Sequence, residues 1–442
     1  MCHARLLSLE MEDKVRRWAD AVAGFVEKKV GGSVAAKLHE CPTTSSSPIS
    51  PQALLSIVGT HALADVAFFV ADARQTEEPA RKFHLLLSAF DAFQAQHMAP
   101  RPHPPVGWDT AVLVTLLRFV HEAARAPGAL SEEAIGNVVR SFRRLFLFLQ
   151  TSDTEYRNDV ARRRGALAVL NGLLAILLIR NNTHQCRAMI TTVEQAEVAA
   201  SGDPTKGVLG PCGHMVAEVI KYQFTASRIQ LFDGQPQLAF NGLRNAFGLM
   251  PPMTVASTPV ARNKLRVAFF WLAAGVLCGV RPPLWLLKLH PELDNVFGGL
   301  FRAFDTADLA AFDAVMQRHA RIFRLHGIYF LLLGARQLCV LAALKRVVAL
   351  LEHLAPTSPS LDSSRVPLSA VLGHFRALST PASDTRDTRK TARADAWCPL
   401  SEDALSLYIA RLVTCGAVKG YLAHEHVFLV LSRKDPFPPP QC

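Results

Sequence analysis

The side chains best suited to binding a metal ion stand in three close pairs. In each pair, histidine or cysteine residues are separated by a single residue: His184 and Cys186, Cys212 and His214, and His424 and His426. A structural zinc site needs four such ligands, usually as two close pairs. The first two pairs lie on neighbouring predicted helical units and could meet in space, but the favoured interpretation is that they do not. We therefore expect no metal site.

Catalytic motifs are missing from the sequence. It contains no Gly-x-Gly-x-x-Gly motif, no phosphate loop ending in Gly-Lys-Ser/Thr and no Gly-x-Ser-x-Gly elbow. The segment Gly202–Gly207 superficially resembles a phosphate loop, but it lacks the Gly-Lys-Ser/Thr step that would place a lysine on the phosphates and a hydroxyl on magnesium. A surface turn is the better interpretation. We expect neither a cofactor nor an enzymatic activity.

Basic side chains towards the C-terminus could instead contact the phosphates of a nucleic acid. The candidates are Arg411, Lys419, Arg433 and Lys434, together with Arg386, Arg389, Lys390 and Arg393 in a polar segment. Such contacts would bind RNA or DNA without reading the base sequence. The net charge of +11 permits polyanion binding without demonstrating it. The alternative for Lys419 is a structural role, with its aliphatic stem packed and its ammonium group in solvent.

The densest basic region of the chain lies further towards the N-terminus. It contains Arg140, Arg143, Arg144, Arg157, Arg162, Arg163 and Arg164. One interpretation is a face that contacts phosphates. The favoured interpretation is a solvated helix face, or partners for the acidic residues nearby.

The elements that position the C-terminal bases can be predicted from local signals. Ser401 is a typical helix N-cap, and Leu405, Ile409 and Leu412 lie on one face of the helix that follows it. Two short runs rich in β-branched and aromatic residues, Lys419–His424 and Val427–Ser432, then predict a hairpin. With a preceding helix at Leu368–Leu378, these elements predict a winged helix. The polar segment 379–396 between its helices is predicted to be a disordered insertion.

The rest of the chain predicts helix after helix with short breaks. Apolar residues at three- and four-residue spacing and tight turns favour antiparallel helical pairs, the unit of a solenoid. We predict a variable N-terminal helix and linker over 1–51, helical repeats over 52–209, and a C-terminal domain over 210–439. Within that domain, repeats cover 210–355, a loop covers Ala355–Pro367, and the winged helix covers 365–434.

Membrane insertion and secretion are not expected. The longest apolar run, Val267–Val280, is followed by Arg281 and is shorter than the roughly 20 residues that a spanning helix needs. The N-terminus lacks the apolar stretch of a signal peptide. The nine cysteines are scattered without a Cys-x-x-Cys pair, which favours a reducing compartment over a disulfide framework.

Several segments carry a resemblance to PCI-domain proteins of the nuclear-pore-associated transcription-and-mRNA-export complex. The tail segments are Val418–His426, Leu429–Ser432 and Asp435–Pro439, and the helical ones are Lys221–Leu249, Arg262–Arg266 and Phe323–Leu331. The resemblance covers roughly Asn158–Pro439. It implies an all-α fold, a right-handed TPR-like solenoid of helical pairs that ends in a winged helix with a small β-hairpin.

The resemblance also implies a function and partners. It implies a non-enzymatic scaffold in the nucleus, associated with the nuclear pore and partly cytoplasmic. Its expected partners are a larger PCI-containing scaffold protein, a small acidic protein shared with the proteasome lid, RNA or DNA, and nuclear pore components. Winged helices of this family also make lateral protein contacts, for which the candidate residues are Tyr408, Tyr421, Phe428 and Phe437. The alternative is a subunit of a signalosome-type or proteasome-lid-like complex that acts only through protein contacts.

Overall fold

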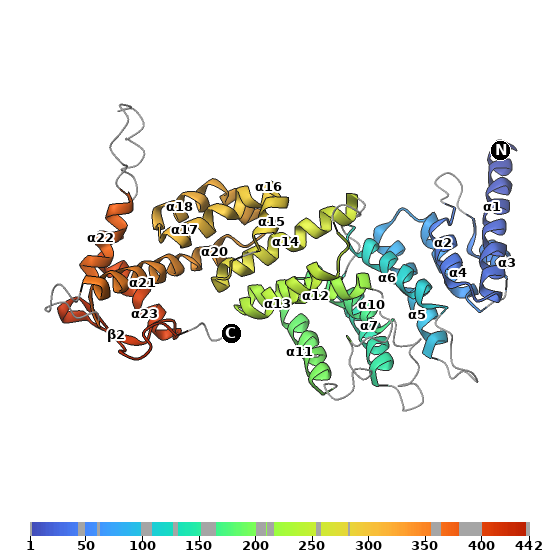
Figure 1. Cartoon of the computed structure of the whole chain (residues 1–442). Helices are drawn as coiled ribbons and strands as arrows, with labels where there is room; N and C mark the ends of the chain where they lie inside the picture. The colour runs from blue at the N-terminus through green and yellow to red at the C-terminus, as the bar shows by residue number, and fades with distance from the viewer. Residues whose placement is uncertain are drawn as a thin grey trace. The chain divides into compact units, whose positions relative to one another are not determined.

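The computed structural model describes residues 2–42, 49–59, 62–98, 108–126, 131–151, 165–199, 209, 216–252, 258–281, 283–354, 364–379 and 400–438. The chain divides into two compact units, Met1–Ile229 and Gln230–Cys442 (Figure 1). Both are built mainly of helices, and none of the helices in the described ranges has an apolar stretch that would reach across a lipid bilayer.

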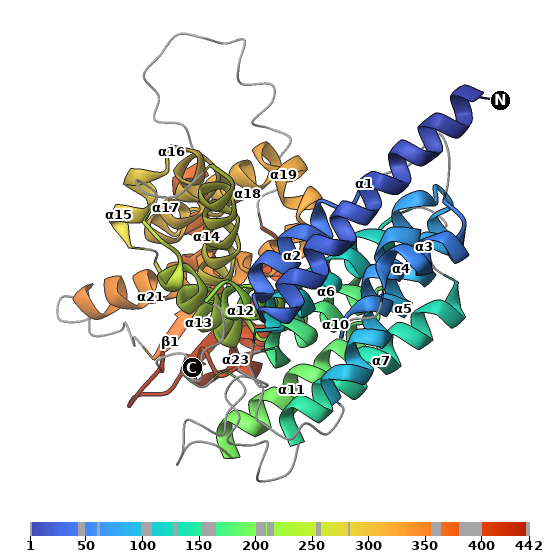
Figure 2. The same ribbon diagram turned by 90° about the vertical axis from the view of Figure 1, so that its right-hand side faces the viewer.

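The first unit is entirely helical in its described residues. Its elements are α1 (Cys2–Glu27), α2 (Gly31–His39), α3 (Pro51–Val58), α4 (Ala64–Gln75), α5 (Pro79–Met98), α6 (Thr110–Ala124), α7 (Glu132–Thr151), α10 (Ala166–Ile179) and α11 (Thr183–Ala199), with the start of α12 (Val216–Phe232). Helices close in sequence pack on one another, as in α4 on α5 and α7 on α10 (Figure 2). Phe83, Phe90 and Phe142 are fully buried between them.

The structure explains two unusual residues in the helices of this unit, Asn171 and Gly31. Asn171 interrupts the buried helix α10, and its side-chain amide donates to the backbone carbonyl of Glu218 at 2.9 Å and to its carboxylate at 2.7 Å. Gly31 begins α2 where a Cβ atom would lie 1.4 Å from the backbone oxygen of Trp108, so only glycine allows this approach.

The second unit continues with helices that lead to the winged helix. They are α13 (Pro236–Leu249), α14 (Thr258–Cys278), α15 (Leu284–Leu289), α16 (Pro291–Leu293), the π-helix η1 (Asp294–Gly298), α17 (Gly299–Thr306), α18 (Leu309–Arg318), α19 (Ala320–Leu325), α20 (Tyr329–Gly334) and α21 (Arg336–Leu354). The helices α13 and α14 pack as a pair, with the rings of Phe247 and Trp271 5.3 Å apart. The helix α20 ends at Gly334, and α21 begins two residues later at Arg336.

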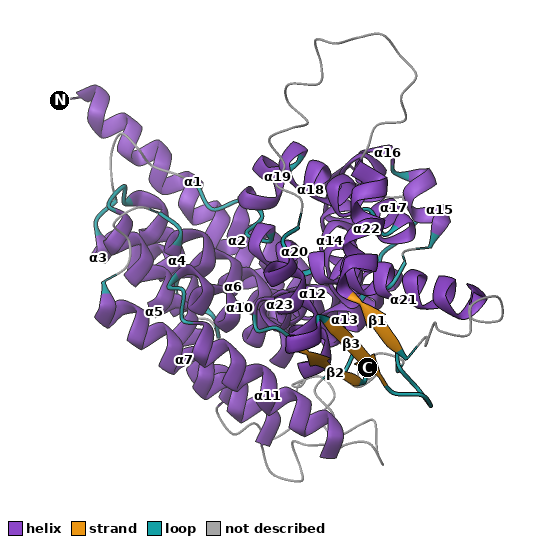
Figure 3. Cartoon of the chain, turned by 90° about the vertical axis from the view of Figure 1, so that its left-hand side faces the viewer, coloured by secondary structure: helices purple, strands orange, loops and turns teal. Residues whose placement is uncertain are grey.

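The winged helix consists of β1 (Arg365–Pro367), α22 (Leu368–Ser379), α23 (Glu402–Thr414), β2 (Gly420–Ala423), the 3-10 turn η3 (His424–His426) and β3 (Phe428–Leu431). The three strands form one antiparallel sheet in the order β1-β3-β2 (Figure 3). The Ser401 hydroxyl accepts from the amide of Ala404 at 3.1 Å, as the predicted N-cap requires. The predicted fold class, a helical solenoid that ends in a winged helix, is confirmed.

One prediction in this region is wrong. The segment Ala355–Pro367 was expected to be a loop throughout, but residues 365–367 form the strand β1 and pair with β3. A proline is tolerated here because β1 is an edge strand of the sheet. The predicted insertion at 379–396 lies outside the described residues, apart from Ser379 at the end of α22.

Candidate partner and nucleic-acid interface

Four of the predicted phosphate-binding residues lie on described parts of the winged helix. Arg411 is exposed on α23, and Arg433 and Lys434 are exposed just after β3. Lys419, just before β2, donates from Nζ to Asp435 Oδ2 at 2.8 Å. The two side chains of this pair are 55% and 45% exposed, so solvent screens the interaction and a phosphate could compete with Asp435. Arg386, Arg389, Lys390 and Arg393 lie outside the described residues.

Two of the predicted partner-binding residues lie together on the wing. In the register of β2 and β3, Tyr421 lies opposite Val430, and Ala423 lies opposite Phe428. Because residues two apart on a strand share a face, Tyr421 and Phe428 are diagonal neighbours on one face. Their exposed fractions are 63% and 36%, whereas Leu429 on the other face is fully buried. The wing therefore presents two aromatic rings to solvent.

The other two predicted partner-binding residues are half-buried within the second unit. Phe437 lies under Lys345, whose Nζ is 5.6 Å from the ring centroid. The Tyr408 hydroxyl accepts from Arg336 Nη1 at 3.0 Å, and the guanidinium carbon lies 5.7 Å from the Tyr408 ring centroid. Tyr408 is therefore engaged inside the chain, with part of its surface still open.

Arg336 connects three helices through interactions that sequence reasoning missed. From the start of α21, its Nη2 donates to Asp313 Oδ2 of α18 at 2.8 Å, while Nη1 reaches Tyr408 of α23. Burial raises the pKa of the Asp313 carboxyl, and the nearby Arg336 charge opposes this effect. Burial would lower the pKa of Arg336, but Asp313 and Tyr408 more than offset it, so that pKa is raised. This cluster fixes the winged helix against the helical array.

A cavity of about 530 Å³ opens beside this cluster. Its walls come from α18, α20, α21 and α23, and they include Met316, Tyr329, Phe330, Leu333, Tyr408 and Arg411. Phe330 is 81% exposed, and Leu325 at the end of α19 is 82% exposed. Asp313 also lines the cavity but is paired with Arg336, and Arg411 adds a second guanidinium group, so the surroundings are apolar and basic. The surface is suited to an acidic or aromatic group of a partner.

Two of the three pairs of possible metal ligands lie in the described residues. Cys186 is buried, its thiol lies 4.0 Å from the backbone oxygen of Leu174, and burial raises the pKa of that thiol to about 11. His424 and His426 are exposed on η3. Cys212 and His214 lie outside the described residues. Within those residues, no three His, Cys, Asp or Glu side chains come close enough to hold a metal ion.

Comparison with known proteins finds similar proteins that carry two different names. PCI domain-containing protein 2 of Danio rerio is 23% identical over 312 residues, which cover 71% of this chain and 65% of that protein. The homolog of the same protein in Drosophila melanogaster is 24% identical over 328 residues, which cover 73% of this chain and 70% of that protein. Protein CSN12 homolog of Debaryomyces hansenii is 30% identical over 149 residues, which cover 34% of this chain and 31% of that protein.

The chain thus aligns with about two thirds of the length of its longer matches. No protein-family model matches it. The relatives' names agree with what the fold shows independently, a helical array closed by a winged helix. Together, the relatives and the fold support a PCI-domain protein.

Proposed function

We propose that this chain is a non-enzymatic scaffold subunit that pairs with a larger PCI-containing scaffold and a small acidic protein. The assembly forms a platform for RNA or DNA and couples transcription to mRNA export at the nuclear pore. The observation that supports this most is the surface of the second unit. Exposed bases on α23 and after β3 belong to the same winged helix as the aromatic pair Tyr421 and Phe428.

The protein-binding part of the proposal rests on exposed apolar side chains. Large apolar groups that stand together on a surface mark interaction sites. Leu325 and Phe330, at the adjoining ends of α19 and α20, are each more than 80% exposed. A partner that covered both would bury their apolar area at about 25 cal/mol per Å². The arginines of the same stretch favour a partner with acidic residues around its apolar anchor.

The nucleic-acid part of the proposal rests on Arg411, Arg433 and Lys434, together with Lys419. All four are exposed, and none lies in the first turn of α23, the end of a recognition helix that contacts base edges in the major groove. The N-terminal turn of α23 carries Glu402 and Asp403, which repel phosphate. These residues are suited to contacting the backbone of RNA or DNA without base specificity.

A second candidate function is a subunit of a signalosome-type complex that acts only through protein contacts. The relatives from Debaryomyces hansenii and Schizosaccharomyces pombe that are named as CSN12 homologs favour it. In this alternative the surface of α19 and α20 still binds a partner. The basic side chains of the wing then contact acidic protein surfaces and not nucleic acid.

The experiment that separates the two is a tagged purification from native cells, followed by mass spectrometry. A large PCI scaffold, a small acidic protein and pore components support the export function, whereas signalosome or proteasome-lid subunits support the alternative. The same purification with Phe330→Asp should lose the partners. Leu238→Asp is the matched control, because Leu238 is a 50% exposed leucine on α13. Recovery of the chain without any such subunit would refute both functions.

A further inference from the structure

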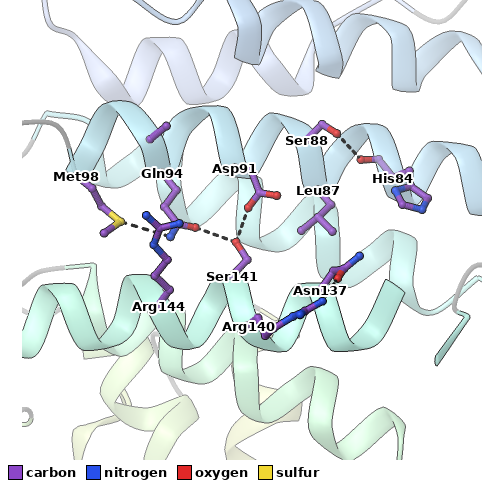
Figure 4. A pocket seen from close by; sticks show the side chains of 11 residues that line it. His84, Leu87, Ser88, Asp91, Gln94, Met98, Asn137, Arg140, Ser141 and Arg144 are labelled. Carbon is purple, nitrogen blue, oxygen red and sulfur yellow. Dashed lines mark hydrogen bonds between the residues drawn. The ribbon is translucent and has the colours of Figure 1, made fainter. Parts of the chain in front are cut away.

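A groove in the first unit, between α5 and α7, has no role in the proposed function. It encloses about 820 Å³ and is lined by His84, Leu87, Ser88, Asp91, Gln94, Ala95, Met98, Asn137, Arg140, Ser141 and Arg144. Figure 4 shows the two helices side by side, with Met98 next to Arg144 at one end and His84 nearer Asn137 at the other. The helices therefore run parallel.

The groove follows from the spacing of the lining residues. On α5 they recur every three or four positions from His84 to Met98, and on α7 from Asn137 to Arg144, so each set forms one stripe of its helix. The opposite side of α7 carries Phe142 and Phe146, which are fully buried. Because the core fixes the rotation of α7, Arg140 and Arg144 must lie on the groove side.

A hydrogen-bonded cluster organises the floor of the groove. The Ser141 hydroxyl contacts the carboxylate of Asp91 and lies 2.8 Å from Gln94 Oε1. Gln94 is only 5% exposed, and its amide donates to the sulfur of Met98 at 3.4 Å. Burial raises the pKa of the Asp91 carboxyl, against the opposing effects of Ser141 and Arg144. The cluster joins the two helices and leaves both guanidinium groups above it.

Arg140 and Arg144 place two guanidinium groups at the groove where a ligand could bind them. Arg140 is exposed, and in the described part of the chain it donates to the neighbouring Asn137, within its own helix. Arg144 is also exposed, and it has no hydrogen-bond partner among the residues that the structure describes. The two stand one helical turn apart, about 6 Å between their Cβ atoms. That spacing matches two carboxylates one turn apart on a helix, and guanidinium binds carboxylate with two parallel hydrogen bonds.

We propose that the α5–α7 groove binds an acidic segment of a partner protein, which places two carboxylates on Arg140 and Arg144 and apolar side chains against Leu87, Ala95 and Met98. The groove lies before the stretch that resembles PCI-domain proteins, so this inference does not depend on the proposed function. A solvated helix face would explain exposed arginines alone. It does not explain their position beside a hollow that Leu87, Ala95 and Met98 help to line and that has a buried, hydrogen-bonded Gln94.

A single-stranded nucleic acid is a poorer occupant. Such strands bind where aromatic side chains stack on successive bases along a basic groove. No Phe, Tyr or Trp is among the residues that line this groove, and only the imidazole of His84 offers an aromatic face. Asp91 also places a carboxylate in the path of a phosphate backbone. One or two carboxylates can avoid Asp91, whereas a continuous chain of phosphates cannot.

The test is fluorescence anisotropy with the full-length protein and a labelled, alanine-rich helical peptide that carries glutamates four residues apart. A peptide with glutamines at those positions is the control ligand. We expect Arg140→Gln combined with Arg144→Gln to weaken binding of the glutamate peptide by roughly tenfold or more. Arg143→Gln should leave the affinity for the glutamate peptide unchanged. This variant removes a positive charge from the same helix, but Arg143 does not line the groove.

A variant that is expected to strengthen binding separates direct binding from a structural effect. Asp91→Asn removes the like charge and should tighten the glutamate peptide by about two- to fivefold at low salt. A merely structural role of the cluster would weaken binding or leave it unchanged. The proposal is overturned if the wild-type protein does not distinguish the two peptides, or if Arg143→Gln weakens binding as much as the groove variants. It is also overturned if a single-stranded oligonucleotide, and not the glutamate peptide, depends on Arg140 and Arg144.

Discussion

Replacing Arg336 by methionine should loosen the winged helix from the helical array. Arg336→Met keeps most of the side-chain length and removes the guanidinium group that joins Asp313 and Tyr408. The side chain of Asp313 is 8% exposed and that of Arg336 is 25% exposed. The variant therefore leaves a buried carboxylate without its cation.

The expected cost can be worked out from this geometry. Removing one partner of a buried ion pair costs about 3–5 kcal/mol in free energy of unfolding. Because Arg336 is a quarter exposed, water can replace part of the interaction, and we expect about 3 kcal/mol. Tyr408→Phe loses one hydrogen bond to a charged donor but keeps the ring, so it should cost about 1 kcal/mol. Asp313→Asn combined with Arg336→Met should cost less than the sum of the single changes, because no charge remains buried.

The penalty should also depend on pH. Burial holds the pKa of Asp313 above its ordinary value of 3.8, so the folded state favours the protonated carboxyl. A raised carboxyl pKa gives stability that is present at low pH and lost as pH rises through the folded-state value. Without Arg336 that pKa rises further, since the cation that lowers it is gone. The cost of Arg336→Met should therefore shrink as the pH falls from 7 towards 5.

The assay is urea unfolding of the full-length variants, combined with hydrogen exchange read by mass spectrometry. Exchange should increase in α22 and α23 and remain unchanged in the first unit, which controls for global damage. If Arg336→Met costs no more than Tyr408→Phe, or if the costs of Asp313→Asn and Arg336→Met are additive, the cluster does not hold the winged helix and the reasoning is wrong.

Two further predictions concern the wing. Replacing Lys419, Arg433 and Lys434 together by glutamate should weaken RNA and DNA binding. The slope of log affinity against log salt should fall by roughly one for each phosphate that the wing no longer binds. Unchanged binding would show that the wing does not contact nucleic acid. Gly420→Ala would place a Cβ atom 2.2 Å from the backbone oxygen of Val430, so β2 must shift and thermal stability should fall. Gly373→Ala on α22 is its control, because its Cβ meets nothing within 4 Å and alanine favours a helix by about 1 kcal/mol; equal losses of stability for both would contradict this geometry.

The parts of the fold that the sequence predicts are those specified by local signals. Ser401 as an N-cap and the apolar face of α23 need only neighbouring residues to be recognised, and so does the hairpin of β2 and β3. The strand β1 was missed because it spans three residues, ends in Pro367, and pairs with Phe428, Leu429 and Val430 far along the chain. A short edge strand shows no periodicity in the sequence, because it forms only by pairing with its neighbouring strand.

The contacts that build the cavity beside Arg336 and the α5–α7 groove also join residues that are far apart in the sequence. Arg336 and Tyr408 are 72 positions apart in sequence, and Ser141 and Asp91 are 50 apart. Local patterns could show that Arg140 and Arg144 share a helix face, and on that evidence a solvated face was the reasonable interpretation. Only the packing of α5 beside α7 reveals that this face borders a hollow.

The role of Arg336 makes it possible to separate direct binding by the wing from the support that holds the wing in place. Arg336 is half-buried, and both of its terminal nitrogens already donate to side chains of the chain, Asp313 and Tyr408, so the exposed bases of the wing are better placed to bind a phosphate. If the winged helix works as a positioned surface, Arg336→Met should weaken nucleic-acid binding through geometry, with the salt slope almost unchanged. The triple glutamate variant should lower both affinity and slope. The same slope for both variants would mean that Arg336 contacts the nucleic acid itself, and the winged helix would then have to open from the helical array on binding.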